Sequence, residues 1–224
     1  MQRSNYQQLP VRPLGPDAIR QLLEDLLGTD PSLAALAEAI QARTVGNPFF
    51  TEEVVRSLVD SGKIEGSRGH YCLVAPVETL EVPATVESIL AARIDRLPER
   101  EKGVLQAAAV IGQEFTEPLL AAVVARPAAD LTEALRTLTS AEFVYEEALY
   151  PVAEYAFKHP LTREVAYRAQ LTARRQETHA AVARTLAAQS AEKLDERAAL
   201  LAHHWERAPS VPTRVRQRGG DSLL

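Results

Sequence analysis

A few side chains in this sequence have the types and spacing that could do chemistry. His203, His204 and Glu206 lie close enough in sequence to suggest a metal site. Neighbouring residues of a helix point about 100° apart, however, and no complete set of metal ligands is near them in sequence. His70 and Cys72 lie on one side of an expected strand, but no activating base accompanies them. These residues therefore predict neither a metal centre nor an active site.

Two expected helix starts carry the remaining candidates. Gly46, Asn47 and Pro48 precede the apolar stripe of a helix, and His159 stands directly before Pro160. A helix start presents backbone N–H groups and a positive dipole end, so either position could contact a nucleotide or a phosphate. Plainer interpretations stay open: Gly and Pro commonly end and restart helices, and a histidine there can cap the helix.

No other constellation for catalysis is visible in the sequence. It has no Ser-His-Asp order, no paired catalytic carboxylates and no G-x-x-x-x-G-K-[ST] phosphate loop. We therefore expect that the chain is not an enzyme by itself.

The composition is that of a soluble globular protein, with 46% hydrophobic and 25% charged residues. A single cysteine excludes an internal disulfide, and no apolar run approaches the ~18 to 20 residues that cross a bilayer. We expect a cytoplasmic protein that binds no membrane. The net charge of -5 gives no overall attraction to nucleic acid.

The first 98 residues predict a compact helical unit with one small hairpin. Apolar residues recur at helical spacing in four stretches, at residues 19–27, 33–40, 50–59 and 86–97. Asp30 and Pro31 have the types expected of an N-cap and a first helical turn. Residues 63–74 break the helical pattern and contain two glycines between short extended runs, which indicates a hairpin.

The next segment predicts three short helices followed by two strands, the order of a winged helix-turn-helix. The helices are expected at residues 99–111, 116–124 and 130–138, and the strands at 143–145 and 155–157. Thr116 is the expected cap of the second helix. Asp130 with Glu133 resembles a capping box at the start of the third.

Residues after Pro160 return to helical spacing and predict an antiparallel helix pair. The two expected faces are His179, Val182, Ala183 and Leu186, and Ala198, Leu201, Ala202 and Trp205. We expect Trp205 to be buried between these helices. Because such a pair buries its apolar face fully only by stacking on neighbours, it is typical of the start of an α-solenoid.

Several ordered runs resemble one known family. They are RTVGNPFFTEEVVRSLVDSGKI, VPATVESILAARIDRLPEREKGVLQAAAVIGQEF, YAFKHPLTREVAY and LLAHHWERA, within residues 10–208. They are similar to bacterial STAND-class signal-transduction ATPases, above all those that lie behind class III nucleotidyl cyclase domains and ahead of tetratricopeptide repeats. In that family a helical lid and a winged helix close over ATP or ADP held by an ATPase core.

The resemblance implies roles for both helix starts. Gly46, Asn47 and Pro48 would lie against the adenine, with the proline packing on the base. His159 matches the histidine of the family's Met-His-Asp motif, which contacts the β-phosphate of ADP. Pro160 stands in place of the motif's aspartate, so the local hydrogen bonds must differ.

The resemblance also implies a domain organisation for this mainly α chain. It predicts a helical lid at 1–98, a winged-helix domain at 99–172, the start of a repeat at 173–208 and a disordered tail at 209–224. The implied partners are an ATPase core, which this sequence lacks, and downstream helical repeats. The missing phosphate loop and the aperiodic tail suggest a truncated or frameshifted reading frame, with nucleotide bound only in the intact parent protein.

The alternative function is a winged-helix DNA-binding regulator. Residues 130–154 hold six acidic residues and one basic residue, Arg136, for a net charge of -5. DNA affinity rests on phosphate neutralisation, so this segment disfavours a duplex.

Overall fold

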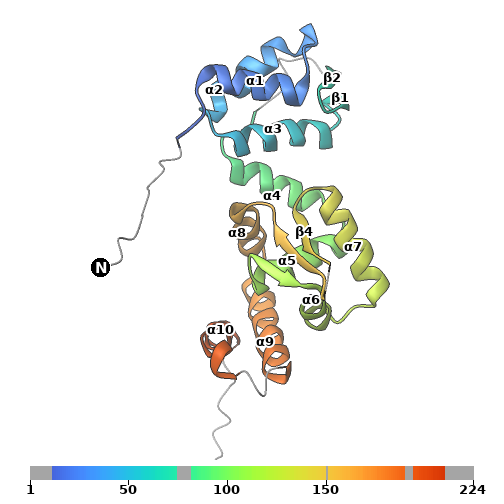
Figure 1. The fold of residues 1–224 in the computed structure, drawn as a ribbon, viewed down its shortest axis with the longest axis vertical. Helices are drawn as coiled ribbons and strands as arrows, with labels where there is room; N and C mark the ends of the chain where they lie inside the picture. The colour runs from blue at the N-terminus through green and yellow to red at the C-terminus, as the bar shows by residue number, and fades with distance from the viewer. Residues whose placement is uncertain (1–11, 75–81, 150, 190–193, 210–224) are drawn as a thin grey trace, which may run out of the picture. The chain divides into compact units, whose positions relative to one another are not determined.

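The computed structural model describes residues 12–74, 82–149, 151–189 and 194–209, and it confirms a mainly helical protein (Figure 1). Residues 1–97 and 98–224 form two compact units, each described by itself below. The predicted tail lies outside the described residues, apart from position 209. None of the described helices is both long and apolar enough to cross a membrane.

The described residues of the first unit form four α-helices, one 3-10 turn and one hairpin. Its elements are α1 (Pro16–Leu27), η1 (Pro31–Leu33), α2 (Ala34–Thr44), α3 (Pro48–Asp60), β1 (Ile64–Ser67), β2 (His70–Leu73) and α4 (Val86–Arg96). As predicted, Asp30 caps the 3-10 turn by accepting a hydrogen bond from the Ser32 N–H at 2.8 Å. Helix α3 packs against α1, α2 and α4, so it occupies the middle of this unit.

The predicted hairpin of the first unit is present, and glycine fixes its position against α1. Strands β1 and β2 pair antiparallel, with Ile64 opposite Leu73. Gly28 has a φ of 95°, and an added Cβ there would lie 2.4 Å from the Gly69 carbonyl oxygen. Only glycine allows this approach of the two backbones.

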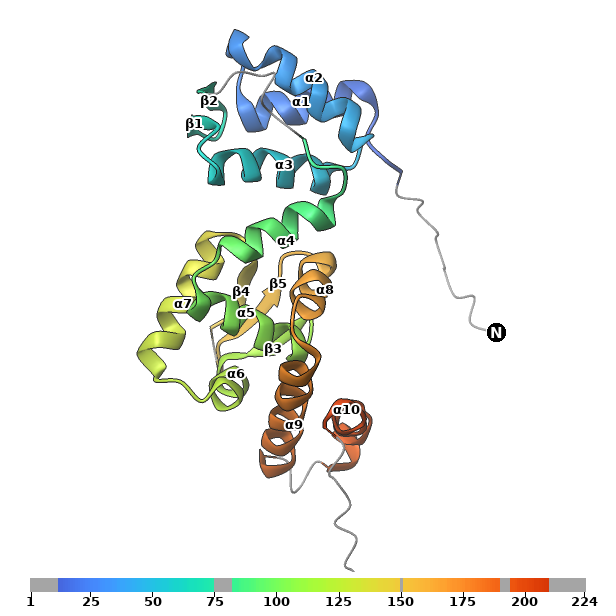
Figure 2. The same ribbon diagram turned by 180° about the vertical axis from the view of Figure 1, so that it is seen from behind.

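The second unit has the element order of a winged helix. It contains α5 (Glu99–Ile111), β3 (Glu114–Thr116), α6 (Glu117–Val124), α7 (Ala128–Ser140), β4 (Val144–Ala148), β5 (Glu154–Phe157) and α8 (Pro160–Arg168). The strands form an antiparallel sheet in the order β3-β5-β4, labelled in Figure 2. Helix α5 packs against α6, α7, α8 and β3 and carries the centre of the core.

One local expectation for this unit holds, one fails, and one strand was not predicted. Thr116 caps α6 as predicted, by accepting from the Leu119 N–H. The capping box of Asp130 and Glu133 is wrong, because α7 begins earlier, after Pro127, and has no side-chain cap. Strand β3 was not predicted, since three residues are too few to show a period of two.

Two further helices follow, α9 (Thr172–Gln189) and α10 (Leu194–Arg207), and lie side by side in both views (Figures 1 and 2). His179 contacts His204, and Val182 clusters with Leu201, which is an antiparallel pairing. The expected burial of Trp205 is wrong: it is 49% exposed, whereas His204 is buried. Helix α10 packs against α9 with the face that carries Leu201 and His204. Ala198 and Ala202 lie off this face and are exposed as well.

Candidate functional site

The first candidate site is the start of α3, where Gly46, Asn47 and Pro48 lie. Asn47 is the N-cap, and its side-chain oxygen accepts from the Phe50 N–H at 3.1 Å. Pro48 occupies the first helical position, where its missing N–H costs nothing. The helix start that the residue types predict is therefore present, and the side chain of Asn47 caps it.

Gly46 has a structural reason to be glycine. Its φ is 79°, and an added Cβ would lie 2.4 Å from the Leu14 carbonyl oxygen. The Leu14 N–H donates to the Gly46 carbonyl oxygen at 2.8 Å. The segment before α1 is thus held against the start of α3.

The surface around this helix start is apolar. Val45 ends α2 in the left-handed region, at a φ of 48°, and is 76% exposed. A β-branched residue is strained in that conformation, and such strain is found most often at functional sites. Leu14 is 38% exposed and Pro48 is exposed as well. These side chains offer an apolar contact surface beside backbone polar groups.

The second candidate is His159, which lies in the second unit between β5 and α8. It is the N-cap of α8: its Nδ1 accepts from the Leu161 N–H at 3.1 Å. Since Nδ1 is an acceptor, the proton of the neutral ring lies on Nε2. The cap therefore fixes the ring orientation and makes Nε2 the donor.

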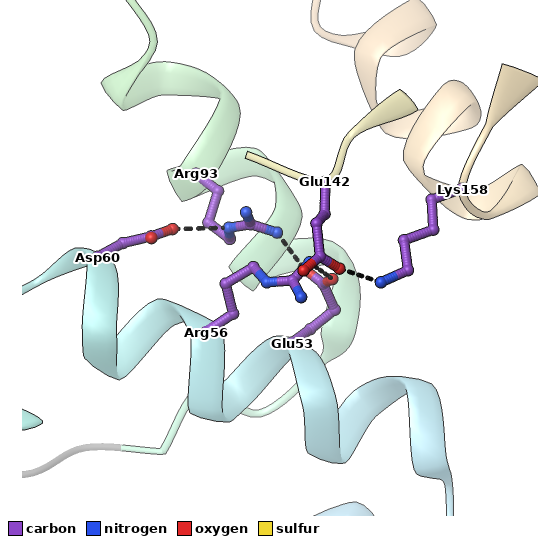
Figure 3. Close-up of polar contacts among 6 residues, drawn as sticks. All are labelled: Glu53, Arg56, Asp60, Arg93, Glu142 and Lys158. Atoms are coloured by element: carbon purple, nitrogen blue, oxygen red, sulfur yellow. Dashed lines mark hydrogen bonds and ion pairs between the residues drawn. The ribbon is translucent and has the colours of Figure 1, made fainter. Parts of the chain in front are cut away.

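Lys158, next to His159, pairs with Glu142 in the same unit (Figure 3). Glu142 has a φ of 56° and lies in the turn between α7 and β4. This ion pair connects the turn before β4 to the residue after β5. Lys158, beside the candidate histidine, is therefore already paired with a carboxylate.

Sequence reasoning missed a buried ion network in the first unit. Arg93 of α4 donates from Nη1 to Glu53 Oε2 at 2.6 Å and from Nε to Asp60 Oδ2 at 2.9 Å (Figure 3). Arg93 and Glu53 are each 3% exposed. The sequence did contain a signal for this network, because Glu53 and Arg93 are charged residues on the apolar faces of their helices. The network joins α3 to α4.

The histidines of α9 and α10 form a second buried polar cluster. His179 Nδ1 lies 2.9 Å from His204 Nδ1, and the Tyr167 hydroxyl lies 2.9 Å from His179 Nε2. Burial, followed by the neighbouring histidines and arginines, lowers the pKa of both His179 and His204 to about 4. His204 Nε2 has no hydrogen-bond partner among the described residues.

This cluster does not have the form of a metal centre. No group of three or more His, Cys, Asp or Glu side chains in the described part of the chain is arranged to hold a metal ion.

The predicted site residues divide between the two units. Gly46, Asn47 and Pro48 share one helix start in the first unit, and His159 caps a helix in the second.

Comparison with known proteins gives a match in the first unit. Residues 15–67 match the family model of a domain of unknown function, DUF8739, which spans α1 to the end of β1. No curated protein matches the chain.

Proposed function

We propose that this chain is the non-catalytic regulatory part of a STAND-type ATP-binding signalling protein. In this proposal residues 1–98 act as a helical lid and residues 99–172 as a winged helix. Each contributes a helix start to an adenine nucleotide that an ATPase core binds. The core, the downstream repeats and a cytoplasmic location all belong to the proposal.

The observation that carries the proposal is the cap at His159. The same hydrogen bond that caps α8 leaves the ring proton on Nε2. An ordered N–H donor beside the positive end of a helix is suited to a phosphate oxygen. A helix cap and a phosphate sensor are therefore compatible at this residue.

The start of α3 supports an adenine contact. A purine is flat and largely apolar, and the exposed ring of Pro48 with the exposed Val45 side chain is suited to such a surface. Because Asn47 already caps the Phe50 N–H, we assign this helix start to the base and not to the phosphates.

The DNA-binding alternative has less support. Arg136, the only basic residue of α7, donates to Glu133 of the same helix at 2.6 Å, and the strands of the wing carry Glu146, Glu147 and Glu154. A recognition helix needs unoccupied basic or amide side chains to contact bases and phosphates. A gel shift is expected to show no salt-sensitive binding of duplex DNA.

The proposal is tested first in the coding sequence that encodes the chain. A G-x-x-x-x-G-K-[ST] motif is expected in frame within roughly 200 to 300 residues upstream, about one to two domains. A full upstream reading frame without that motif would remove the ATPase core from the proposal.

A further inference from the structure

The second unit contains a small polar pocket that none of the functions above uses. It has a volume of about 150 Å³ and lies where α5, the end of α6, the end of α8 and the start of α9 meet. Arg126, Arg174 and Thr178 line its rim, and Gln106 and Gln170 line its inner part. No acidic side chain is among the lining residues.

The inner part of the pocket contains an amide without a partner among the described side chains. Gln106 and Gln170 are each 7% exposed. Gln170 Nε2 donates to the Gln106 backbone carbonyl at 3.0 Å, but the Gln106 side chain makes no hydrogen bond to any described residue. Solvent still reaches the amide nitrogen and oxygen of Gln106. A polar ligand that enters the pocket can therefore hydrogen-bond to this amide in place of water.

The rim supplies positive charge that is not neutralised. No described carboxylate pairs with Arg126 or Arg174, although most other arginines described in this unit lie beside one. The Arg174 guanidinium lies over Gly103, where an added Cβ would come 3.4 Å from Nη2. Two guanidinium groups beside an amide are the donors that oxyanions prefer in proteins.

We propose that this pocket binds a phosphate-type oxyanion, either inorganic phosphate or the phosphate group of a small monoester. Its volume of about 150 Å³ is roughly ten times the ~10 to 15 Å³ that a cavity needs to hold one water molecule, so a phosphate group fits. The pocket is distinct from His159, because Gln170 lies beyond the opposite end of α8. Eleven residues separate the two, so roughly 15 Å of helix lies between them.

The test is titration calorimetry of the full chain with inorganic phosphate and, separately, with methyl phosphate, at constant ionic strength set by chloride. Arg174→Gln and Arg126→Gln should each raise the dissociation constant at least tenfold, the effect of losing a charge-assisted hydrogen bond. Arg184→Gln is the matched control, because it removes the same charge from an exposed position of α9 outside the pocket.

Gln106→Leu provides a second readout. The substitution removes the amide donor, so it should weaken phosphate binding while leaving the melting temperature of the phosphate-free protein nearly unchanged. Equal binding of methyl phosphate and phosphate would assign the site to esters as well as the free ion, and rejection of the ester would assign it to the ion. Loss of binding in Arg184→Gln to the same extent as in Arg174→Gln, or no binding at all, would overturn the proposal.

Discussion

In the first unit a buried arginine lies between two carboxylates, whereas in the second unit two histidines are buried against each other. Arg93 keeps its charge because Glu53 and Asp60 compensate it. His179 and His204 have no carboxylate partner among the described residues, and Arg163, Arg175 and Arg207 act on them from the surrounding helices. One cluster is stable because it is ionised, and the other is stable only while it is neutral.

Because of this difference, we expect the stability of the two units to depend differently on pH. The ion network fixes α3 to α4 through paired opposite charges. The histidine pair fixes α9 to α10 only above the pH at which it takes up protons. The attachment of α10 is therefore the part of the molecule that mild acid should loosen first.

The largest expected effect comes from breaking the ion network on one side. Arg93→Ala removes the partner that lies 2.6 Å from the buried Glu53 and leaves it only Arg56, 3.9 Å away. The loss should be at the lower end of the about 3 to 5 kcal/mol that breaking a buried ion pair costs. Glu52→Ala is the control on the same helix, since Glu52 pairs with no described cation. Urea unfolding followed by circular dichroism measures both.

The double variant Glu53→Leu/Arg93→Met sharpens that result. It replaces both charges by apolar side chains, so it should recover most of the lost stability. If Arg93→Ala cost less than about 1 kcal/mol, the network would be no more than a surface ion pair.

Acid should act on the other cluster. The pKa of His179 and His204 in the folded protein, about 4, lies below the ordinary value of 6.5. As the pH falls below 6.5, His179 and His204 become protonated in the unfolded chain but stay neutral in the folded chain. Stability is thus complete above pH 6.5 and is lost progressively toward pH 4, by about 3 kcal/mol or more.

Hydrogen exchange at pH 7 and pH 5 locates that loss. The α10 amides should lose protection before those of α3 and α4, after correction for the intrinsic exchange rate. His204→Phe should reduce the pH dependence, because it removes one of the two coupled groups. Equal loss of protection in both units would contradict the contrast between them.

The smallest expected effect concerns the cap of α8. His159→Ala should lower the stability of the second unit by about 1 kcal/mol, as loss of an N-cap does. Asparagine is among the best N-caps, so His159→Asn should be close to neutral. A thermal melt of both variants measures the difference, and similar losses in both would mean that the cap contributes little.

The sequence predicted most helices because their apolar spacing and end signals agree. Gly112 and Thr116 show this, since each ends or begins a helix where its type indicates. Trp205 shows the limit of the method. Leu201 belongs to two possible stripes of α10, and only packing against His179 decides that His204 is buried in place of Trp205.

The candidate sites differ in the same way. Gly46, Asn47, Pro48 and His159 are visible in sequence because each marks a helix start within a few residues. The pocket of Gln106, Arg126 and Arg174 is assembled from residues far apart in the chain, and no spacing rule brings them together. Arg93 could have been found as a charge on an apolar helix face, but not its partners.

The most direct test of the proposed function is the ADP affinity of the protein that carries both this chain and an ATPase core. The account predicts that His159→Ala and His159→Asn both weaken ADP by one to two decades, as expected for losing a charge-assisted hydrogen bond, and weaken ATP less. His159→Asn keeps the cap, so lost helix stability could not explain its effect. Unchanged ADP affinity in His159→Asn would contradict the account and leave His159 as a helix cap alone.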